Sequence, residues 1–455
     1  MSPLPAPAKV PAPQVCVVGV GYVGEHLVSV FARKFQVLGY DVSPARVNHL
    51  TRVHGNNPRL ELSTTPGRAT SCDLFCIAVP TPICAGDDGG IDLTYLEAAV
   101  ATVGGLAKPG AAVVIESSVA VGTTRRLLAP LRERGLFIGF SPERVDPGRV
   151  DPPAHVIPKV LAAMDKPSMD RLHNLYGAAF DNIIPVSTLE TAEMSKLFEN
   201  CFRLVNIAYA NEIADACQAH GIDPHEMVRA CATKPYGFMP FTPGLGAGGP
   251  CIPVNPHYLL VNNDLPLLRS AMTTNAARPA ARAQALVIKY PAAKRILVSG
   301  IGFKPGQALT VHSPGLGLAL ALGRLGKAVT LHDPLACAGK NELEGLAVLP
   351  PDGWETNALF KAFDLVCVAM PQAGVDFGVL HGFVDGTVEW LCAPALCGPA
   401  DAHKSLAETA GSKACVASGL ASRAEHGSFA AVAENKECAH GKGSLLSIQV
   451  SAVQP

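Results

Sequence analysis

Residues 15–34 read VCVVGVGYVGEHLVSVFARK, and this stretch decides the expected fold of the N-terminal part of the chain. Val15–Gly19 predicts a short buried strand, and the residues after it have helical spacing. Between strand and helix stand Gly19, Gly21 and Gly24, in the order G-x-G-x-x-G. Glycines at such a turn let the backbone N–H groups at the helix N-terminus approach a phosphate. The pattern indicates a dinucleotide-binding unit rather than a structural glycine turn.

The acidic residue that such a unit requires is Asp41, about twenty residues further on. It follows the second expected strand, Phe35–Tyr40. A carboxylate at this position can bind the ribose hydroxyls of adenosine and would repel the 2′-phosphate of NADP. The sequence therefore predicts NAD as the cofactor.

Apolar segments continue to alternate with helical patterns along the chain, which is typical of a doubly wound parallel sheet. The first series has strands at Asp73–Val79, Ala111–Glu116, Leu136–Phe140, Ile157–Ala162 and Ile183–Val186, and helices at Leu93–Val103 and Thr123–Arg134. A second series has strands at Arg295–Ser299, Ala328–His332 and Leu365–Ala369, and a helix at Pro314–Gly323. We therefore expect two sheets of the same class.

A long helix is expected between the two sheets, at Thr191–His220. Apolar residues recur there at helical spacing, which predicts one buried face; they are Met194, Leu197, Phe198, Cys201, Leu204, Val205, Ala208, Ile213 and Cys217. About 30 residues make a helix of about 45 Å, long enough to join two domains. Ser187 and Glu190 have the spacing of a capping box, and Gly221 can end the helix.

A polar stripe runs along the same helix, because Lys196, Asn200 and Arg203 stand at i, i+4 and i+7. Two interpretations are open at this point. The cations can simply solvate one face, with Glu199 paired to Arg203, or the stripe can line a ligand site.

We expect an α/β protein with two Rossmann-like doubly wound sheets joined by a long central helix. The expected parts are a Pro/Ala-rich tail (1–14), an NAD-binding Rossmann domain (15–186), a central helical domain (187–290), a C-terminal Rossmann-like domain (291–391) and a low-complexity tail (392–455). Within the central domain we expect a short helix at Pro224–Cys231 and a Gly/Pro-rich loop at Phe241–Pro256. We expect that last tail to be poorly ordered.

Composition limits the class of protein. Hydrophobic residues make up 48% of the 455 residues and charged residues 16%, with a formal net charge of −1. We therefore expect no nucleic-acid partner and no membrane partner, and no apolar run reaches the roughly 18 residues of a spanning helix. The N-terminal residues lack the apolar core of a signal peptide.

The 14 cysteines form no CxxC pairs and no Cys/His clusters. We expect no bound metal and a reducing, cytoplasmic location. Cys16, Cys76 and Cys367 lie within apolar strands, where cysteine is an ordinary core residue.

Cys251 is different, because it lies in a loop of glycines and prolines, TPGLGAGGPCIPVNPHYL. Glycines permit close approach of the backbone to a ligand, and a nearby cation such as Lys196 would lower the pKa of the thiol. Cys251 is thus a candidate nucleophile.

Glu143 and Arg144 follow directly after an expected strand, in SPERVDPG. A carboxylate at the C-terminal end of a parallel strand faces the usual ligand crevice. The alternative is a surface Glu–Arg turn.

Together these motifs resemble those of the nucleotide-sugar 6-dehydrogenases, the UDP-glucose/GDP-mannose dehydrogenase family. The resemblance runs from about Val15 to Leu380, through GVGYVG, ESSVAVGTT, SPERVDPG, AEMSKLFEN, GLGAGGPCIP, GIGFKP and HSP in the family order. SPERVDPG, IPKV and FENCFRLVNIAYANE look most like the branch that acts on UDP-N-acetylglucosamine and UDP-N-acetylmannosamine, with UDP-glucose close behind.

The resemblance implies two successive NAD-dependent oxidations of the C6 alcohol of a UDP-sugar to a carboxylate. Lys196, Asn200 and a water would balance the charge on oxygen, and Cys251 would form a thiohemiacetal and then a thioester. Glu143 would help water to hydrolyse the thioester. It further implies a UDP-binding C-terminal domain and a homodimer or higher oligomer built on the long helix.

The resemblance also assigns the individual site residues. The catalytic residues are Cys251, Lys196, Asn200, Glu143 and Ser118; the cofactor-binding residues are Gly19, Gly21, Tyr22, Val23, Gly24, Asp41, Arg46, Thr81 and Ser118; the substrate-binding residues are Glu143, Arg144, Lys196, Asn200, Arg203, Gly244, Gly248 and Lys304.

Five positions depart from the family pattern: Ser118 replaces a threonine, Pro250 a histidine or aromatic residue, Asn255 an aspartate, and Leu309 and Val311 the Asp and Arg of a D-x-R-x-S-P motif. Asn255 keeps hydrogen bonding but loses a base, which puts thioester hydrolysis most at risk.

Three hypotheses follow: an active four-electron dehydrogenase, a nucleotide-sugar-binding homologue without turnover, and an NAD enzyme that stops at the aldehyde.

Overall fold

The computed structural model describes residues 13–84, 90–146, 148–149, 151–382 and 388–392. The two expected tails, 1–14 and 392–455, lie outside these ranges except for residues 13, 14 and 392.

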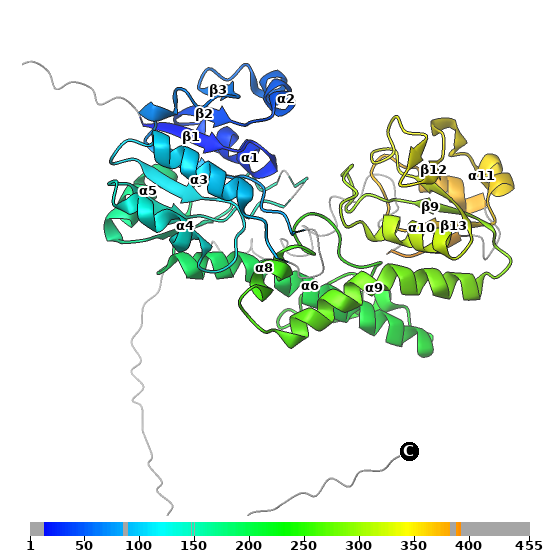
Figure 1. Cartoon of the computed structure of the whole chain (residues 1–455). Helices are drawn as coiled ribbons and strands as arrows, with labels where there is room; N and C mark the ends of the chain where they lie inside the picture. The colour runs from blue at the N-terminus through cyan, green and yellow to red at the C-terminus, as the bar shows by residue number, and fades with distance from the viewer. Residues whose placement is uncertain (1–12, 85–89, 147, 150, 383–387, 393–455) are drawn as a thin grey trace, which may run out of the picture. The chain divides into compact units, whose positions relative to one another are not determined.

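The first sheet has the strand order β3-β2-β1-β4-β5-β6-β7-β8; its strands β3, β2 and β1 are labelled in Figure 1. Its strands are β1 (Gln14–Val18), β2 (Gln36–Tyr40), β3 (Leu60–Ser63), β4 (Leu74–Ile77), β5 (Ala112–Ile115), β6 (Phe137–Phe140), β7 (Lys159–Ala163) and β8 (Ile183–Pro185). Neighbours pair in parallel except β6 and β7, which are antiparallel. Because β1 pairs with both β2 and β4, the chain reverses its winding there, at the point where doubly wound sheets bind ligands.

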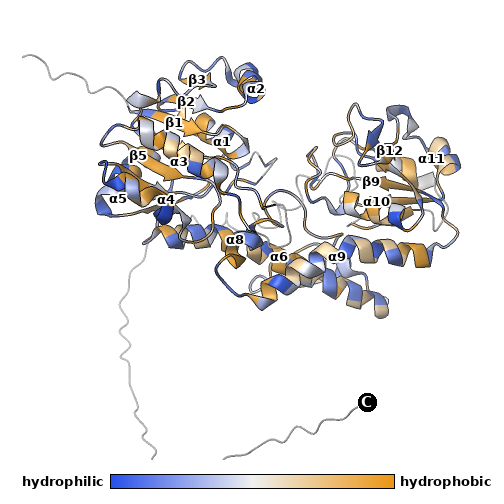
Figure 2. Cartoon of the chain, in the orientation of Figure 1, coloured by the Kyte–Doolittle hydropathy of each residue, from blue (hydrophilic) through white to orange (hydrophobic). Residues whose placement is uncertain are grey.

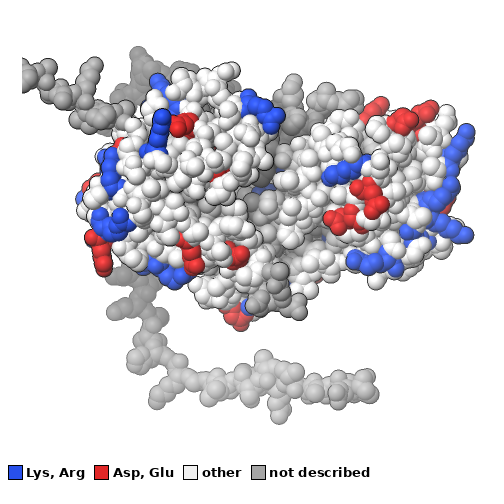
Figure 3. Space-filling view, turned by 45° about the horizontal axis from the view of Figure 1, so that its top comes forward, with Lys and Arg blue, Asp and Glu red and all other residues white. Residues whose placement is uncertain are grey.

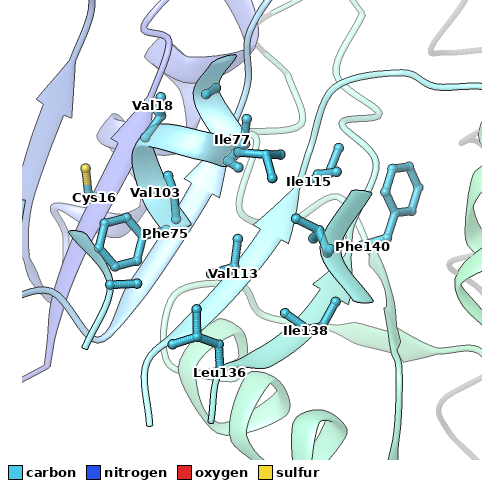
Figure 4. Close-up of a cluster of buried hydrophobic side chains, with 14 of the residues drawn as sticks. Cys16, Val18, Phe75, Ile77, Val103, Val113, Ile115, Leu136, Ile138 and Phe140 are labelled. Carbon is cyan, nitrogen blue, oxygen red and sulfur yellow. The ribbon is translucent and has the colours of Figure 1, made fainter. Parts of the chain in front are cut away.

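The helices of the first sheet are α1 (Tyr22–Phe31), α2 (Pro44–His54), α3 (Thr94–Leu106), α4 (Thr123–Arg132) and α5 (Lys166–Gly177), with a short 3₁₀ turn η1 (Ala69–Ser71). Successive residues of β1 enter different buried clusters: Cys16 and Val18 join Phe75 and Phe140 (Figure 4), and Val17 joins the cluster on the other face. This alternation follows from the two-residue period of a strand.

The long helix is α6 (Leu189–Ala219). Its N-cap is Thr188, whose hydroxyl accepts the Thr191 N–H at 3.0 Å, so the expected capping box is wrong. Glu190 instead pairs with Arg125 at 2.6 Å. The end of the helix is as expected, because Gly221 follows it with a φ of +65°.

The buried face of α6 is only partly the expected one. Five of the expected residues are buried, namely Leu197, Cys201, Leu204, Ala208 and Cys217. Met194 and Phe198 are instead 38% and 62% exposed. They lie on a second apolar face of the helix, which points away from the core. The helical spacing of apolar residues in the sequence does not distinguish this exposed face from the buried one.

The central region also contains α7 (Pro224–Ala232), α8 (Asn255–Leu260) and α9 (Pro266–Lys289), and α9 lies alongside α6 (Figure 1). The sequence analysis missed α9, since Pro279 stands inside it and alanines and arginines break its apolar spacing. Leu204, Tyr258 and Leu268 share one buried cluster of this region.

The second sheet has the order β11-β12-β10-β9-β13-β14. Its elements are β9 (Arg295–Ser299), α10 (Pro314–Arg324), β10 (Ala328–His332), β11 (Glu342–Leu343), β12 (Leu346–Val348), η2 (Pro351–Gly353), α11 (Thr356–Ala362), β13 (Leu365–Val368), η3 (Phe377–Gly382) and β14 (Val388–Trp390). Apolar strands again form the interior (Figure 2). The expected fold class, two Rossmann-like sheets joined by a long helix, is confirmed.

Over the residues that the structure describes, no helix combines the length and the apolarity needed to cross a bilayer.

Candidate active site

The glycine turn between β1 and α1 is shaped for close backbone approach. Gly19 has a φ of +84°, and a Cβ on Gly24 would lie 1.9 Å from the Gly19 carbonyl oxygen. A Cβ on Gly21 would meet nothing within 4 Å, and no side chain caps α1. The first N–H groups of α1 therefore have no side-chain cap, which suits an incoming pyrophosphate. Tyr22 and Val23 form the first turn of this helix.

Asp41, the predicted ribose-binding residue, lies beside the glycine turn. Its carboxylate accepts the N–H groups of Val20 and Ser43, both at 2.9 Å, which fixes its direction beside the glycine turn. Arg46 crosses the same turn, donating to the Val20 carbonyl at 2.7 Å and pairing with Glu25 at 2.6 Å. The residues present fit a dinucleotide, and Arg46 supports the turn rather than standing free.

A second connection to this edge of the sheet runs through Thr81. Its hydroxyl donates to the Ser118 carbonyl at 2.9 Å. The Tyr258 hydroxyl hydrogen-bonds to Thr81, at its carbonyl oxygen and at Oγ1. Since Tyr258 lies on α8, the helix after Cys251, this contact ties the cysteine loop to the expected cofactor side.

The Cys251 loop is held by backbone contacts that need glycine. The Gly249 N–H donates to the Val311 carbonyl at 3.0 Å, and a Cβ on Gly248 would lie 2.8 Å from Pro314 Cδ. The Gly244 N–H donates to Asn211 at 2.8 Å. Gly248 thus has a structural reason to be glycine, whereas a Cβ on Gly244 would come no closer than 4.0 Å to the Leu391 carbonyl oxygen.

Lys196 and Cys251 influence each other electrostatically. Burial lowers the pKa of Lys196, while Cys251 and Glu143 oppose this. Burial raises the pKa of the Cys251 thiol, and Lys196 and Arg203 counteract the rise. Among the described residues, no hydrogen bond or ion pair ties the Lys196 ammonium. The polar stripe of α6 therefore faces the cysteine loop.

Asn200, the middle residue of the stripe, is buried and hydrogen-bonded to another side chain. Its side-chain N–H donates to Asn255 Oδ1 at 2.5 Å, and both residues are almost fully buried. Two neutral amides thus stand together beside the cysteine loop.

Glu143 is not part of a surface turn, so that alternative is wrong for this residue. It is buried, with Oε1 accepting the N–H groups of Arg144 and Val145 and Oε2 lying 3.3 Å from Lys159 Nζ. Arg144 pairs with Glu199 at 2.6 Å. The expected Glu199–Arg203 pair is therefore wrong, because Glu199 points to Arg144.

Lys304 donates to Asp146 at 2.6 Å, which joins the SPERVDPG and GIGFKP segments. The same corner is close to the first helix: burial raises the pKa of Tyr22 to about 12, and Asp146 and Glu143 add to the rise. Leu309 and Val311 are about half exposed, so neither fills the core.

Sequence reasoning gave no role to Glu116, Lys159 and Tyr176, which form a buried network around Glu143. The available signal was a charged residue at the edge of an apolar strand. No three or more His, Cys, Asp or Glu side chains within the described ranges are arranged to hold a metal ion. On the face drawn in Figure 3, Lys and Arg are interspersed with Asp and Glu.

Comparison with known proteins agrees with this arrangement. Residues 13–180 match the NAD binding domain of the UDP-glucose/GDP-mannose dehydrogenase family, and residues 190–277 match the central domain of that family. A UDP-N-acetyl-D-mannosamine dehydrogenase of Pyrococcus horikoshii is 32% identical over 363 residues, 73% of this chain and 86% of the relative. The enzyme of that name from Methanococcus maripaludis is 30% identical over 349 residues, 71% and 80% of the two chains.

Solved structures show the same fold. A UDP-D-ManNAc dehydrogenase from Pyrococcus horikoshii has a TM-score of 0.69 at 26% identity, covering 83% of this chain and 99% of that one. A UDP-glucose dehydrogenase from Pyrobaculum islandicum has a TM-score of 0.73 at 24% identity, covering 85% and 96%.

These matches define an NAD-dependent oxidoreductase of the nucleotide-sugar dehydrogenase class. The chain belongs to the UDP-glucose/GDP-mannose dehydrogenase family. The expected family, enzyme class and cofactor are thereby confirmed.

Proposed function

We propose that this protein oxidises C6 of UDP-N-acetyl-D-mannosamine from the alcohol to the carboxylate, in two steps. The substrate is inferred from the relatives, which include proteins of that name from archaea and bacteria. UDP-N-acetylglucosamine and UDP-glucose are the alternatives within the same class. The observation that carries the proposal is the Lys196 ammonium, free of any described partner, beside a loop thiol and a buried carboxylate.

In the first oxidation, the O6 proton of the sugar passes to a water and a hydride leaves C6 for NAD, while Lys196 donates to O6 and stabilises the alkoxide. The side-chain amide of Asn200 lies on the same face of α6 and adds a polar contact. The glycine turn of α1 and Asp41 would hold two molecules of NAD in succession, each of which would accept one hydride.

In the second stage, the Cys251 sulfur forms a bond to the aldehyde carbon, and the thiol proton passes to the aldehyde oxygen. The resulting thiohemiacetal loses a proton and a hydride and becomes a thioester. Lys196 stabilises the oxyanion character of both species. Because burial raises the pKa of Cys251, the nearby Lys196 and Arg203 cations matter for its deprotonation.

Hydrolysis then restores the thiol. Water adds to the thioester carbon, Glu143 accepts a proton from that water, and the C–S bond breaks to leave the carboxylate and Cys251. The fixed direction of the Glu143 carboxylate, held by two backbone N–H groups and by Lys159, supports this role.

A parallel assay tests the proposal. Purified protein and NAD are mixed with UDP-N-acetylmannosamine, UDP-N-acetylglucosamine, UDP-N-acetylgalactosamine, UDP-glucose and GDP-mannose, and NADH absorbance is followed. We expect UDP-N-acetylmannosamine to give the highest kcat/KM. A higher value with another sugar would contradict the substrate assignment while leaving the enzyme class intact.

A second candidate is a nucleotide-sugar-binding homologue without turnover. It is favoured by Leu309 and Val311, two exposed apolar residues where the family resemblance leads one to expect Asp and Arg. Asn255, paired with Asn200, likewise carries no charge. Thermal stabilisation by NAD and a UDP-sugar, with no NADH from any sugar, would select this candidate.

We also propose a homodimer that covers the second apolar face of α6. Phe198, Phe202 and Tyr209 are exposed along this helix, and Tyr236 and Met239 are exposed just after α7. Exposed apolar residues gathered in this way are typical of an interface. Light scattering is expected to give a dimer mass, and Phe198→Glu a monomer; a monomeric unaltered protein would exclude the dimer.

A reducing, cytoplasmic location is proposed as well. It is supported by the free state of every described cysteine, Cys251 among them. Fractionation of cells expressing the full chain would test it.

A further inference from the structure

Lys159 stands at the start of β7 with its side chain only 3% exposed. Its Nζ lies 2.6 Å from Glu116 Oε2, 3.3 Å from Glu143 Oε2 and 3.1 Å from the Pro142 carbonyl oxygen. It also lies 5.4 Å from the centroid of the Phe180 ring. A buried ammonium without partners would be strongly destabilising, so the two carboxylates are what allow a charged lysine here.

Glu116 is the deeper of the two carboxylates and is 1% exposed at the end of β5. Its Oε1 accepts a hydrogen bond of 2.7 Å from the Tyr176 hydroxyl on α5, while its Oε2 is the atom next to Lys159. Burial raises the pKa of Glu116 to about 7, against the opposing effect of Lys159. This carboxyl group therefore exchanges its proton near neutral pH.

Glu143 is held from two sides. Backbone N–H groups of Arg144 and Val145 occupy Oε1 at 2.7 and 2.8 Å, and Lys159 faces Oε2. Burial acts to raise the pKa of Glu143, but Lys159 and the two N–H groups outweigh it, so the pKa is lowered. The carboxylate is ionised and cannot turn without losing contacts on both oxygens.

We propose that Lys159 is a positioning residue for hydrolysis of the Cys251 thioester. Its ammonium keeps Glu143 ionised and fixes the direction of that carboxylate. Glu116 also contacts the ammonium, and therefore sets how strongly Lys159 stabilises the ionised form of Glu143. The inference rests on the proposed function, in which Glu143 takes a proton from water as the C–O bond forms. In the same step the C–S bond breaks, and the Cys251 sulfur leaves with the electron pair and is then protonated.

Two substitutions separate this role from a purely structural one, because they move the pKa of Glu143 in opposite directions. Lys159→Met removes the ammonium, so the pKa of Glu143 should rise. The acid limb of the hydrolysis profile, which is the pH below which protonation of Glu143 slows hydrolysis, should then rise by about 1 to 3 pH units. Glu116→Gln removes the carboxylate that competes for Lys159 and repels Glu143, so the acid limb should move to lower pH. A side chain that only supports the fold would lower the rate by one factor at every pH.

The pH dependence has to be read with the other groups that face this cluster. Lys196 on α6 and Tyr22 on α1 interact electrostatically with Glu143. Tyr176 on α5 and Cys76 on β4 face Glu116, and burial raises the pKa of both well beyond neutrality. Both variants leave Lys196, whose pKa is lowered by burial, in place.

The experiment is rapid mixing of the full-length protein with NAD and the preferred UDP-sugar, with NADH absorbance followed from the first turnover into steady state. Both oxidations precede hydrolysis, so Lys159→Met should keep a fast phase of about two NADH per active site. Its steady-state rate should fall about tenfold for each pH unit below the new acid limb and recover at higher pH. Lys159→Arg should retain the rate, and Lys166→Met, at an exposed lysine on α5, is the matched control.

If Lys159→Met fails to fold, the double substitution K159M/E116Q removes both charges of the buried pair and leaves no uncompensated ion between them. It should still show an upward shift of the acid limb, smaller than that of Lys159→Met, because loss of the Glu116 charge lowers the pKa of Glu143. An unshifted limb in folded variants, with normal turnover of the unaltered protein, would overturn the role of Lys159 alone. No NADH from the unaltered protein with any UDP-sugar would overturn the proposed function and this inference together.

Discussion

Replacing Tyr258 by Phe removes one hydroxyl group that links the cysteine loop to the expected cofactor side. Tyr258 is 3% exposed, and its hydroxyl contacts Thr81 at the carbonyl oxygen and at Oγ1, the latter at 2.9 Å. Phe fits the same cavity but donates nothing. The Thr81 hydroxyl keeps its own bond to the Ser118 carbonyl, so the main loss is one hydrogen bond to the Thr81 backbone.

The magnitude follows from leaving a buried acceptor without a donor, which costs about 1 to 3 kcal/mol. Thr81 is only half-buried, so water can replace part of the bond, and we expect about 1 to 2 kcal/mol. Such a loss lowers the Tm of a chain of this size by a few degrees. If Thr81 helps to shape the cofactor site, each 1.4 kcal/mol lost from NAD binding raises its KM about tenfold.

The assay is thermal unfolding of Tyr258→Phe together with KM for NAD measured at saturating UDP-sugar. Tyr95→Phe removes the same atom from an exposed tyrosine on α3 and is the matched control. An unchanged Tm and an unchanged KM for NAD in Tyr258→Phe would show that this hydrogen bond contributes neither to stability nor to NAD binding.

Three further predictions concern the cofactor, the buried acid and the cysteine loop. Asp41→Asn should lower the ratio of kcat/KM for NAD over NADP, because it removes the charge that repels a 2′-phosphate; equal ratios before and after would contradict this. The raised folded-state pKa of Glu116 contributes stability below its unfolded value that is lost as pH rises toward about 7. Glu116→Gln should therefore flatten the fall in unfolding free energy over about pH 4.5 to 7, as measured by urea denaturation at several pH values. Asn255→Asp should keep the bond to Asn200 and raise steady-state turnover where hydrolysis limits it, and a turnover that falls at every pH would argue against this.

The parts of the fold that sequence predicted were those with an unambiguous local signal. The glycine turn and Asp41 carry the whole dinucleotide pattern in one βαβ unit, and the apolar strands β9 and β10 have the expected bounds. Helix α9 was missed because its burial is set by packing against α6 rather than by a stripe of its own apolar residues.

The candidate site, like the fold, was predicted from the sequence only in part. Cys251, Lys196 and Glu143 were singled out by residue type in an unusual context, and the structure brings their charges within range of one another. Lys159 and Glu116 could not be paired from sequence, since they stand at the ends of different strands and meet only when β5 and β7 enter one sheet. Partners such as Glu199 with Arg144 likewise depend on tertiary contact, which no helical spacing encodes.

The measurement that tests the central claim most directly is the number of NADH formed per UDP-N-acetylmannosamine consumed, in the unaltered protein and in Cys251→Ser. We expect two NADH per sugar with the carboxylate as product, and loss of that four-electron turnover in Cys251→Ser. Full four-electron turnover in Cys251→Ser would contradict the covalent mechanism, and one NADH per sugar in the unaltered protein would show an enzyme that stops at the aldehyde.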